Sequence, residues 1–119
     1  DYWVWKAISV IEPAVVVIEY NALFPPSESF TIAYDPERTW RGSTYSGASL
    51  KALEKLGAEK GYKLVGCSTS GVNAFFVRKD LVADHFLAPH TAEEHYEPFR
   101  AFLTLARGHS PEFGEWVEI

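Results

Sequence analysis

Three consecutive polar side chains follow an uninterrupted aliphatic run, in a position that suits substrate binding. The run covers residues 14–18, and Glu19, Tyr20 and Asn21 come directly after it. A β-branched run without polar alternation is typical of a strand that is covered on both faces. In open α/β sheets, ligands bind beyond the carboxyl ends of the parallel strands. We therefore expect these three residues to form a substrate-binding strand end, with Glu19 and Asn21 orienting the substrate.

The segment after this strand end, residues 21–46, has no convincing periodicity and carries scattered aromatic side chains. A loop of this length is unusual inside a compact domain and is either functional or mobile. Within it we expect a minor strand over residues 31–33. We also expect Tyr34, Trp40 and Tyr45 to wall the substrate pocket above the strand end.

Each of these candidates also has a purely structural interpretation. A carboxylate at the end of a buried strand is costly unless it is paired, so Glu19 could instead form an ion pair with Arg38 or Arg41. The aromatic side chains would then simply anchor the loop. Asp1 is a plausible helix N-cap, because its carboxylate can accept a hydrogen bond from the amides of the first turn.

Two further groups of reactive side chains point to structure more than to chemistry. Histidine and carboxylate side chains can bind zinc or iron, and residues 84–95 are rich in both. However, His85, His90 and His95 are five residues apart and a proline interrupts them, so no single helix face holds them together. We therefore predict no metal site. Cys67 lies in an expected buried strand, where a cysteine usually behaves as a small apolar residue.

The composition excludes several classes of protein. The chain has 119 residues, of which 47% are apolar, enough for one domain with a real core. Its formal net charge of −5 argues against nucleic-acid binding, which needs a basic surface to neutralise phosphates. No apolar run approaches the roughly 20 residues that span a bilayer, so we expect no membrane partner. A single cysteine excludes an internal disulfide and fits a reducing, cytoplasmic location.

The start of the chain resembles neither an initiator nor a leader. The sequence contains no methionine, and it opens on residues that already predict a helix. No charged segment followed by an apolar stretch precedes them, so they are not a signal peptide. We expect the chain to be the C-terminal part of a longer protein; the alternative is a processed N-terminus.

Local patterns predict a strand–loop–helix–hairpin order for the first two thirds of the chain. Helical spacing of Val4, Ile8 and Ile11 predicts a helix over residues 2–11, which Pro13 ends. The other expected elements are a strand over residues 14–20, a helix over 47–60, and strands over 62–67 and 72–78. Ser46 or Ser49 can cap the second helix, and Gly61 can close it in a left-handed conformation. A short Gly-containing connection makes the last two strands an antiparallel hairpin.

The remaining residues predict short helices. One or two turns are expected over residues 80–86, and Thr91 and Glu94 have the spacing of a capping box. A further helix is expected from about 99 to 107. We therefore predict two parts, a sheet-containing unit over residues 1–81 and a helical extension over 82–119 that packs on it.

Four sequence segments together resemble FkbM-like, class I S-adenosylmethionine-dependent methyltransferases over residues 1–81. DYWVWKAI at residues 1–8 resembles the helix after the fourth strand of that family, and AVVVIEYN at residues 14–21 resembles its fifth strand. LEKLG with KGYKLV, within residues 53–65, resembles the next helix and strand, and GVNAFFVR at residues 71–78 resembles the closing strand. The resemblance implies the C-terminal part of a Rossmann-like α/β sheet, in which the three main strands are those named above.

The resemblance implies S-adenosylmethionine as the cofactor of the longer protein and a small-molecule or glycan-type acceptor as its substrate. It would also place Asp1 near the cofactor. A cofactor site of this type needs a Gly-rich turn after the first strand and an acidic residue after the second, and this sequence has neither. We therefore expect the chain alone to bind no cofactor and to be inactive. The alternative is a non-catalytic interaction module that uses the aromatic loop over residues 21–46.

The resemblance also implies an incomplete sheet. In that family the last strand inserts between the two preceding ones, which would leave the strand over residues 14–20 at an edge. A long apolar edge favours association with another chain. We expect either a homodimer through residues 15–18 or coverage of this edge by the C-terminal helices.

Overall fold

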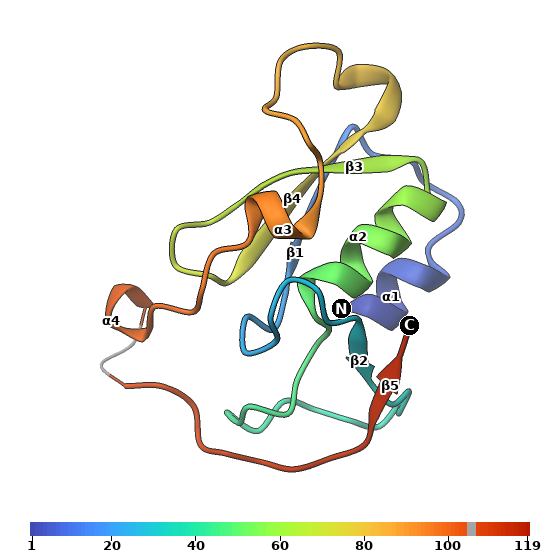
Figure 1. Cartoon of the computed structure of the whole chain (residues 1–119). Helices are drawn as coiled ribbons and strands as arrows, with labels where there is room; N and C mark the ends of the chain where they lie inside the picture. The colour runs from blue at the N-terminus through green and yellow to red at the C-terminus, as the bar shows by residue number, and fades with distance from the viewer. Residues whose placement is uncertain (105–106) are drawn as a thin grey trace.

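The computed structural model describes residues 1–104 and 107–119 and is a small mixed α/β domain with antiparallel sheets and flanking helices (Figure 1). One sheet has three strands in the order β1 (Val15–Glu19), β4 (Asn73–Arg78) and β3 (Tyr62–Cys67). The other sheet pairs β2 (Phe30–Ile32) with β5 (Trp116–Glu118).

The central strand of the larger sheet, β4, is antiparallel to both of its neighbours. It follows that β1 and β3 run in the same direction and that their carboxyl ends lie at the same end of the sheet. The predicted hairpin and the predicted insertion of the last strand between the other two are therefore confirmed.

The ten-residue helix α2 (Leu50–Glu59) covers one face of this sheet and follows the sequence signals closely. Its N-cap is Ser49, whose hydroxyl accepts a hydrogen bond of 3.2 Å from the amide of Ala52. Gly61 ends the helix region with a φ of +83°, the left-handed conformation that glycine adopts without strain. Between α2 and the sheet lies the core, whose largest fully buried side chains include Phe76, Leu53, Leu56 and Leu64.

The first helix is shorter than predicted. Helix α1 covers Tyr2–Ala7 and ends at Ile8, which is already extended. Residues 8–14 continue without regular structure and leave Ile11 exposed, so the prediction of a helix to residue 11 is wrong. The physical reason is the sequence Ile8–Ile11, in which β-branched residues lower helix propensity just before the restriction that Pro13 imposes on Glu12.

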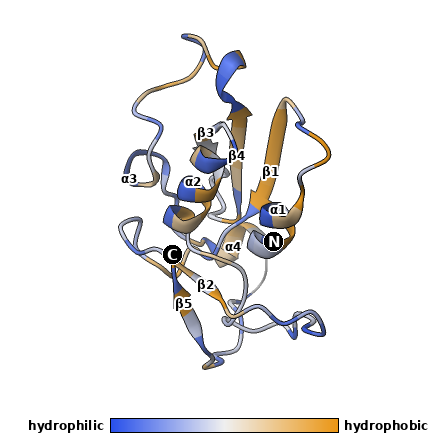
Figure 2. Cartoon of the chain, turned by 90° about the vertical axis from the view of Figure 1, so that its right-hand side faces the viewer, coloured by the Kyte–Doolittle hydropathy of each residue, from blue (hydrophilic) through white to orange (hydrophobic). Residues whose placement is uncertain are grey.

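Strand β1 is covered on one face only, which corrects the prediction of a strand buried on both faces. Val16 and Ile18 point towards the core. Val15 and Val17 point away from it and remain 51% and 55% exposed. Figure 2 shows β1 in the colour of hydrophobic residues at the outer side of the sheet. An aliphatic run indicates that a strand is apolar, but it does not show which faces of the strand the rest of the chain covers.

The residues after Leu81 form a long strap around the domain. They follow a 3₁₀ turn (η1, Lys79–Leu81) and contain two short helices, α3 (Ala92–His95) and α4 (Ala101–Thr104), and the unpredicted strand β5. Within the helix expected over residues 99–107, α4 begins only at Ala101. Residues 105 and 106 of that prediction lie outside the described part of the chain. Strand β5 pairs with β2 in antiparallel register, with Thr31 opposite Val117.

Helix α3 is capped by a residue that the local pattern did not indicate. The side chain of Thr91 makes no capping hydrogen bond, so the expected capping box is not formed. The amide of Ala92 instead donates to Oε2 of Glu54, on α2, over 2.7 Å. Lys51 bridges the same carboxylate and Glu93, each at 3.0 Å. In the described residues, no helix is long and apolar enough to cross a membrane.

Candidate functional site

The carboxyl ends of β1 and β3 lie at the same end of the sheet, where several polar side chains gather. Tyr20 directly follows β1, and Ser68 directly follows β3. The turn between β3 and β4 is closed by Ser68, whose hydroxyl accepts hydrogen bonds from the amides of Val72 and Asn73 at 3.3 and 3.0 Å. The chain direction of β1 and β3 thus brings together, at one end of the sheet, residues that are about 50 positions apart in the sequence.

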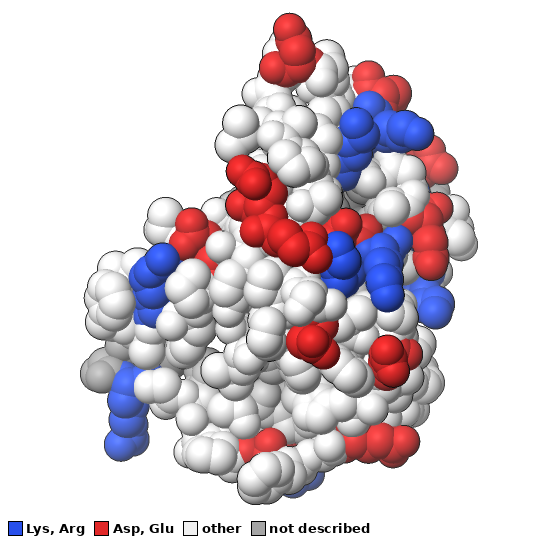
Figure 3. Space-filling model, in the orientation of Figure 1, with Lys and Arg blue, Asp and Glu red and all other residues white. Residues whose placement is uncertain are grey.

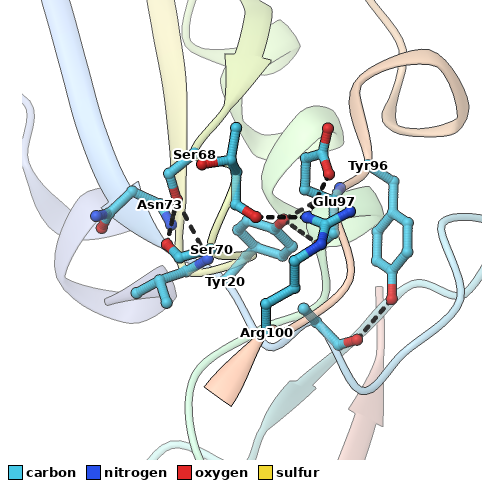
Figure 4. Close-up of polar contacts among 10 residues, drawn as sticks. Tyr20, Ser68, Ser70, Asn73, Tyr96, Glu97 and Arg100 are labelled. Atoms are coloured by element: carbon cyan, nitrogen blue, oxygen red, sulfur yellow. Dashed lines mark hydrogen bonds and ion pairs between the residues drawn. The ribbon is translucent and has the colours of Figure 1, made fainter. Parts of the chain in front are cut away.

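Residues 96–100 cross this end of the sheet; we call them the cover segment. The Tyr20 hydroxyl donates a hydrogen bond of 2.6 Å to the carbonyl of Glu97, and the amide of Glu97 points back to the same hydroxyl at 3.3 Å. The Tyr96 hydroxyl donates to the carbonyl of Ala22 over 2.6 Å. Figure 4 shows Tyr20 next to Glu97 and Arg100 of the cover segment, with Tyr96 of the same segment to the right.

The cover segment is also fixed to the hairpin turn. The amide of Arg100 donates to the carbonyl of Ser70 over 2.9 Å, and its guanidinium group donates to the carbonyl of Thr69. The same guanidinium lies 2.6 Å from a carboxylate oxygen of Glu97 (Figure 4). Gly71 has a φ of +70°, and a Cβ built on it would overlap the carbonyl of Pro98. The close contact between these two backbones therefore requires glycine.

Burial changes the acidity of two groups beneath the cover segment. The Tyr20 side chain is almost fully buried, and this burial, together with the neighbouring Cys67 thiol, raises the pKa of its hydroxyl. Burial also raises the pKa of Cys67 to about 11. Both groups are therefore protonated at neutral pH. Cys67 lies at the end of β3, as predicted, next to the Tyr20 hydroxyl, and its raised pKa disfavours the thiolate that a nucleophile requires.

Glu19 and Asn21 lie at the strand end as expected but have different roles. Asn21 is fully used as a loop anchor: its side-chain amide donates to the carbonyls of Thr44 and Ser46, each over 3.0 Å. Glu19 is exposed, and no ion pair of the described residues involves it. It lies directly opposite Asn73 in the β1–β4 register, so the carboxylate and the carboxamide share one face of the sheet.

The three aromatic residues expected to wall a pocket do not come together. Tyr45 is buried, donates a hydrogen bond of 2.7 Å to the carbonyl of Glu115, and lies under the guanidinium of Arg38. Tyr34 and Trp40 are 67% and 60% exposed. The ring of Tyr34 contacts Trp3, whereas that of Trp40 contacts His109.

The alternative ion pair of Glu19 with Arg38 is not formed either. Arg38 instead lies 3.5 Å from Glu112 in the C-terminal segment. Together with the anchoring bond from Tyr45, this contact shows that residues after 109 help to hold the loop over residues 21–46. The structural interpretation of the loop aromatics therefore applies to Tyr45, while Tyr34 and Trp40 remain available at the surface.

Asp1 occupies the N-cap position of α1, but its side chain makes no capping hydrogen bond, so the expected cap is absent. Its backbone carbonyl accepts from the amide of Trp5 over 2.9 Å. Asp1 lies at one end of a shallow, mainly apolar groove of about 240 Å³ between α1 and the outer side of β1. Val4, Ile8 and Val17 line the same groove.

The histidines are dispersed, and the described residues contain no group of three or more side chains that could hold a metal ion. Nδ1 of His90 lies 3.1 Å from the carbonyl of Leu64, and its ring stacks at 6.4 Å on His95. Figure 3 shows acidic side chains over α3 next to basic side chains over α2, an arrangement that fits the ion pair of Lys51 with Glu93. On this face, charge therefore serves to hold the two helices together.

Sequence analysis missed the residues of the cover segment that contact the strand ends. Tyr96, Glu97 and Arg100 lie beyond the residues that carry the family resemblance, and their partners are about 30 to 77 positions away. No local pattern encodes such contacts. Comparisons with protein-family models, with curated proteins and with solved structures find no match to this chain.

Proposed function

We propose that this chain is the C-terminal, acceptor-side half of an FkbM-like, S-adenosylmethionine-dependent methyltransferase domain. The observation that carries the proposal is the order β1-β4-β3, with a reversed strand between two strands of one direction. The sequence resemblance predicts the same order. In the longer protein, the domain would transfer a methyl group to a small-molecule or glycan-type acceptor.

The outer edge of β1 supports an incomplete sheet. The amide of Arg78 donates to the carbonyl of Ala14, and the amide of Tyr20 donates to the carbonyl of Val72. Backbone groups alternate in direction along a strand. The amide and carbonyl groups of the even-numbered residues of β1 therefore face β4, and the amide and carbonyl groups of Val15, Val17 and Glu19 face outwards. Among the described residues, no strand pairs with these outward groups. A neighbouring strand from the cofactor-binding half would satisfy them.

The residues of this chain fit an acceptor better than they fit the cofactor. No Gly-rich turn follows a strand, and no acidic residue follows a second parallel strand in the position that binds ribose hydroxyls. Glu19 and Asn73 offer an adjacent carboxylate and carboxamide at the carboxyl end of β1. Such a pair can accept from and donate to an acceptor hydroxyl, and so orient it.

Calorimetric titration of S-adenosylmethionine into this chain and into the longer protein tests the proposal. Binding by the longer protein alone is the expected result, and binding by neither contradicts the proposal. In the longer protein, Glu19→Gln should lower acceptor methylation about tenfold while cofactor affinity stays constant, because one charged hydrogen bond to the acceptor is lost. Glu118→Gln, an exposed carboxylate on β5, is the matched control and should leave both values unchanged.

A second candidate function is a non-catalytic interaction module. It is favoured by the exposed rings of Tyr34 and Trp40 on a loop whose ends are firmly anchored. If the longer protein does not bind S-adenosylmethionine, this candidate leads. In that case Trp40→Ala should leave the unfolding midpoint unchanged, since the side chain contributes little to the core.

The isolated chain should also form a homodimer through residues 15–18. In the part of the chain that the structure describes, α3 packs on β3 and α2, and β5 pairs with β2, so neither element pairs with this edge. Outward backbone groups and two exposed valines together favour addition of another strand. Sedimentation of this chain as a monomer at all concentrations would contradict the expectation.

A further inference from the structure

The cover segment, residues 96–100, lies where ligands reach an α/β sheet of this kind. Its contacts with Tyr20, with the 68–72 turn and with Ala22 bridge the carboxyl ends of β1 and β3. Most of these hydrogen bonds end on backbone carbonyls, so they define the position of the segment without requiring a particular side chain opposite. The fit of Pro98 against Gly71 adds a steric constraint.

The same segment has the features of a part that opens more easily than the core. Helix α3, which precedes it, has only four residues, too few to be stable without tertiary contacts. Its apolar anchorage is limited: Tyr96 and Phe99 are only half-buried, whereas the strands beneath contribute fully buried Phe76 and Leu64. Segments with few buried apolar contacts open locally at lower free energy than the whole domain.

From these observations we infer that residues 96–100 form a reversible cover over the Tyr20–Cys67 end of the sheet. In the closed state the cover occupies the hydroxyl of Tyr20. In the open state that hydroxyl becomes free to contact a ligand at the carboxyl end of β1, on the core face of the sheet and not on the face that carries Glu19 and Asn73. The role of the cover in catalysis rests on the proposed function, whereas its opening does not.

The only cysteine of the chain reports on this opening. Cys67 is half-buried beside Tyr20 and close to Glu97, so a thiol reagent reaches it more readily once the cover has moved. Opening would be followed in this chain as the rate of labelling by 5,5′-dithiobis(2-nitrobenzoate) at constant pH. The tested variant is Arg100→Ala, which removes the guanidinium contacts with Thr69 and Glu97. The matched control is Lys79→Ala, which removes an exposed cation on the other side of the hairpin.

Arg100→Ala should accelerate labelling of Cys67 about tenfold. Losing one charge-assisted hydrogen bond should raise the equilibrium constant for opening by about that factor. Lys79→Ala should label at the unaltered rate. Amide exchange provides a second measurement: residues 96–100 should exchange faster in Arg100→Ala, while the amides of β4 keep their protection.

Two results would overturn the inference. One is a labelling rate of Cys67 that does not change in Arg100→Ala. The other is faster amide exchange in β4 as well as in residues 96–100, because the segment would then unfold together with the core. Failure of the proposed function gives a different result, because the longer protein would then not bind S-adenosylmethionine while Cys67 labelling still responded to Arg100→Ala.

Discussion

The two outer edges of the three-stranded sheet differ in how the chain completes them. At β3, the carbonyl of Leu64 points outwards and meets Nδ1 of His90 at 3.1 Å, and helix α3 packs alongside. At β1, three residues present outward backbone groups, and the described residues supply no strand to pair with them. Among the described residues, the C-terminal segment therefore contacts one edge, and no strand pairs with the other.

The described part of the C-terminal segment contacts the β3 side of the sheet and the strand ends, but it does not pair with the outer edge of β1. It reaches β3 through His90, reaches the carboxyl ends through residues 96–100, and then turns away to pair with β2. A self-sufficient small domain would be expected to protect an apolar edge as well. This asymmetry supports the proposal that a further strand pairs with β1.

The largest expected effect separates the two faces of β1. Ile18→Ala should lower the free energy of unfolding by about 2–5 kcal/mol, because it leaves a cavity in the core. Val17→Ala should cost less than about 1 kcal/mol in the isolated chain, because 55% of that side chain is already exposed. Urea unfolding of both variants measures the contrast. Equal losses would mean that something covers the second face of β1 in solution.

The next effect tests the contact between the hairpin turn and the cover segment. Gly71→Ala should destabilise the chain by about 2–3 kcal/mol, since it combines left-handed strain with a clash against the Pro98 carbonyl. Gly61→Ala is the matched control: its φ is +83°, but nothing lies within 4 Å of the added Cβ, so about 1 kcal/mol of strain is expected. If the two losses measured by urea unfolding are equal, the cover segment does not rest on the turn.

Elements with local sequence signals were predictable from the residues. Ser49, Gly61 and the leucine spacing between them define α2, and the short Gly71 connection defines the hairpin. The order of the strands followed from the resemblance of several segments, not from any one of them. These predictions share a feature: the determining residues lie within a few positions of the structure that they specify.

Contacts between distant residues were not predictable in the same way. Glu54 caps α3 from 38 positions away, in place of the local capping box at Thr91. The three-residue strand β5 is too short to carry an alternating pattern, and it forms only because β2 offers a partner. At the site, Asn21 and Tyr45 were expected to face a substrate, yet their polar groups are used by the loop and the C-terminal segment. A single sequence identifies residue types suited to binding but does not show which of them the fold has already used.

A charged side chain at the outer edge of β1 tests whether that edge mediates self-association. Val17→Lys should weaken self-association of the isolated chain about tenfold, because pairing would bury a lysine without a partner. Its unfolding midpoint should change little. Phe113→Lys, at another exposed apolar position, is the control and should leave association unchanged. Sedimentation equilibrium gives the association constants; a loss of association in both variants would point to nonspecific hydrophobic contact.

The smallest effect concerns pH and the buried end of β3. Burial raises the pKa of Cys67 from 9.0 to about 11, so the unfolded chain loses this proton first. The stability contributed by the neutral thiol is therefore complete below pH 9 and is lost as pH rises from about 9 to about 11. By pH 10 the difference should be about 1 kcal/mol or less, because the thiol is only partly buried.

Cys67→Ala isolates this contribution from the tyrosines and lysines that titrate nearby. Urea unfolding of the two proteins at pH 8 and pH 10 should show a smaller decline for the variant, and the gap between the two declines measures the thiol together with its effect on the neighbouring Tyr20 hydroxyl. Equal declines would mean that Cys67 is as accessible to water in the folded chain as in the unfolded one. The cover segment could not then be closed over the end of β3, and the contrast between a protected strand end and an unprotected edge would be lost.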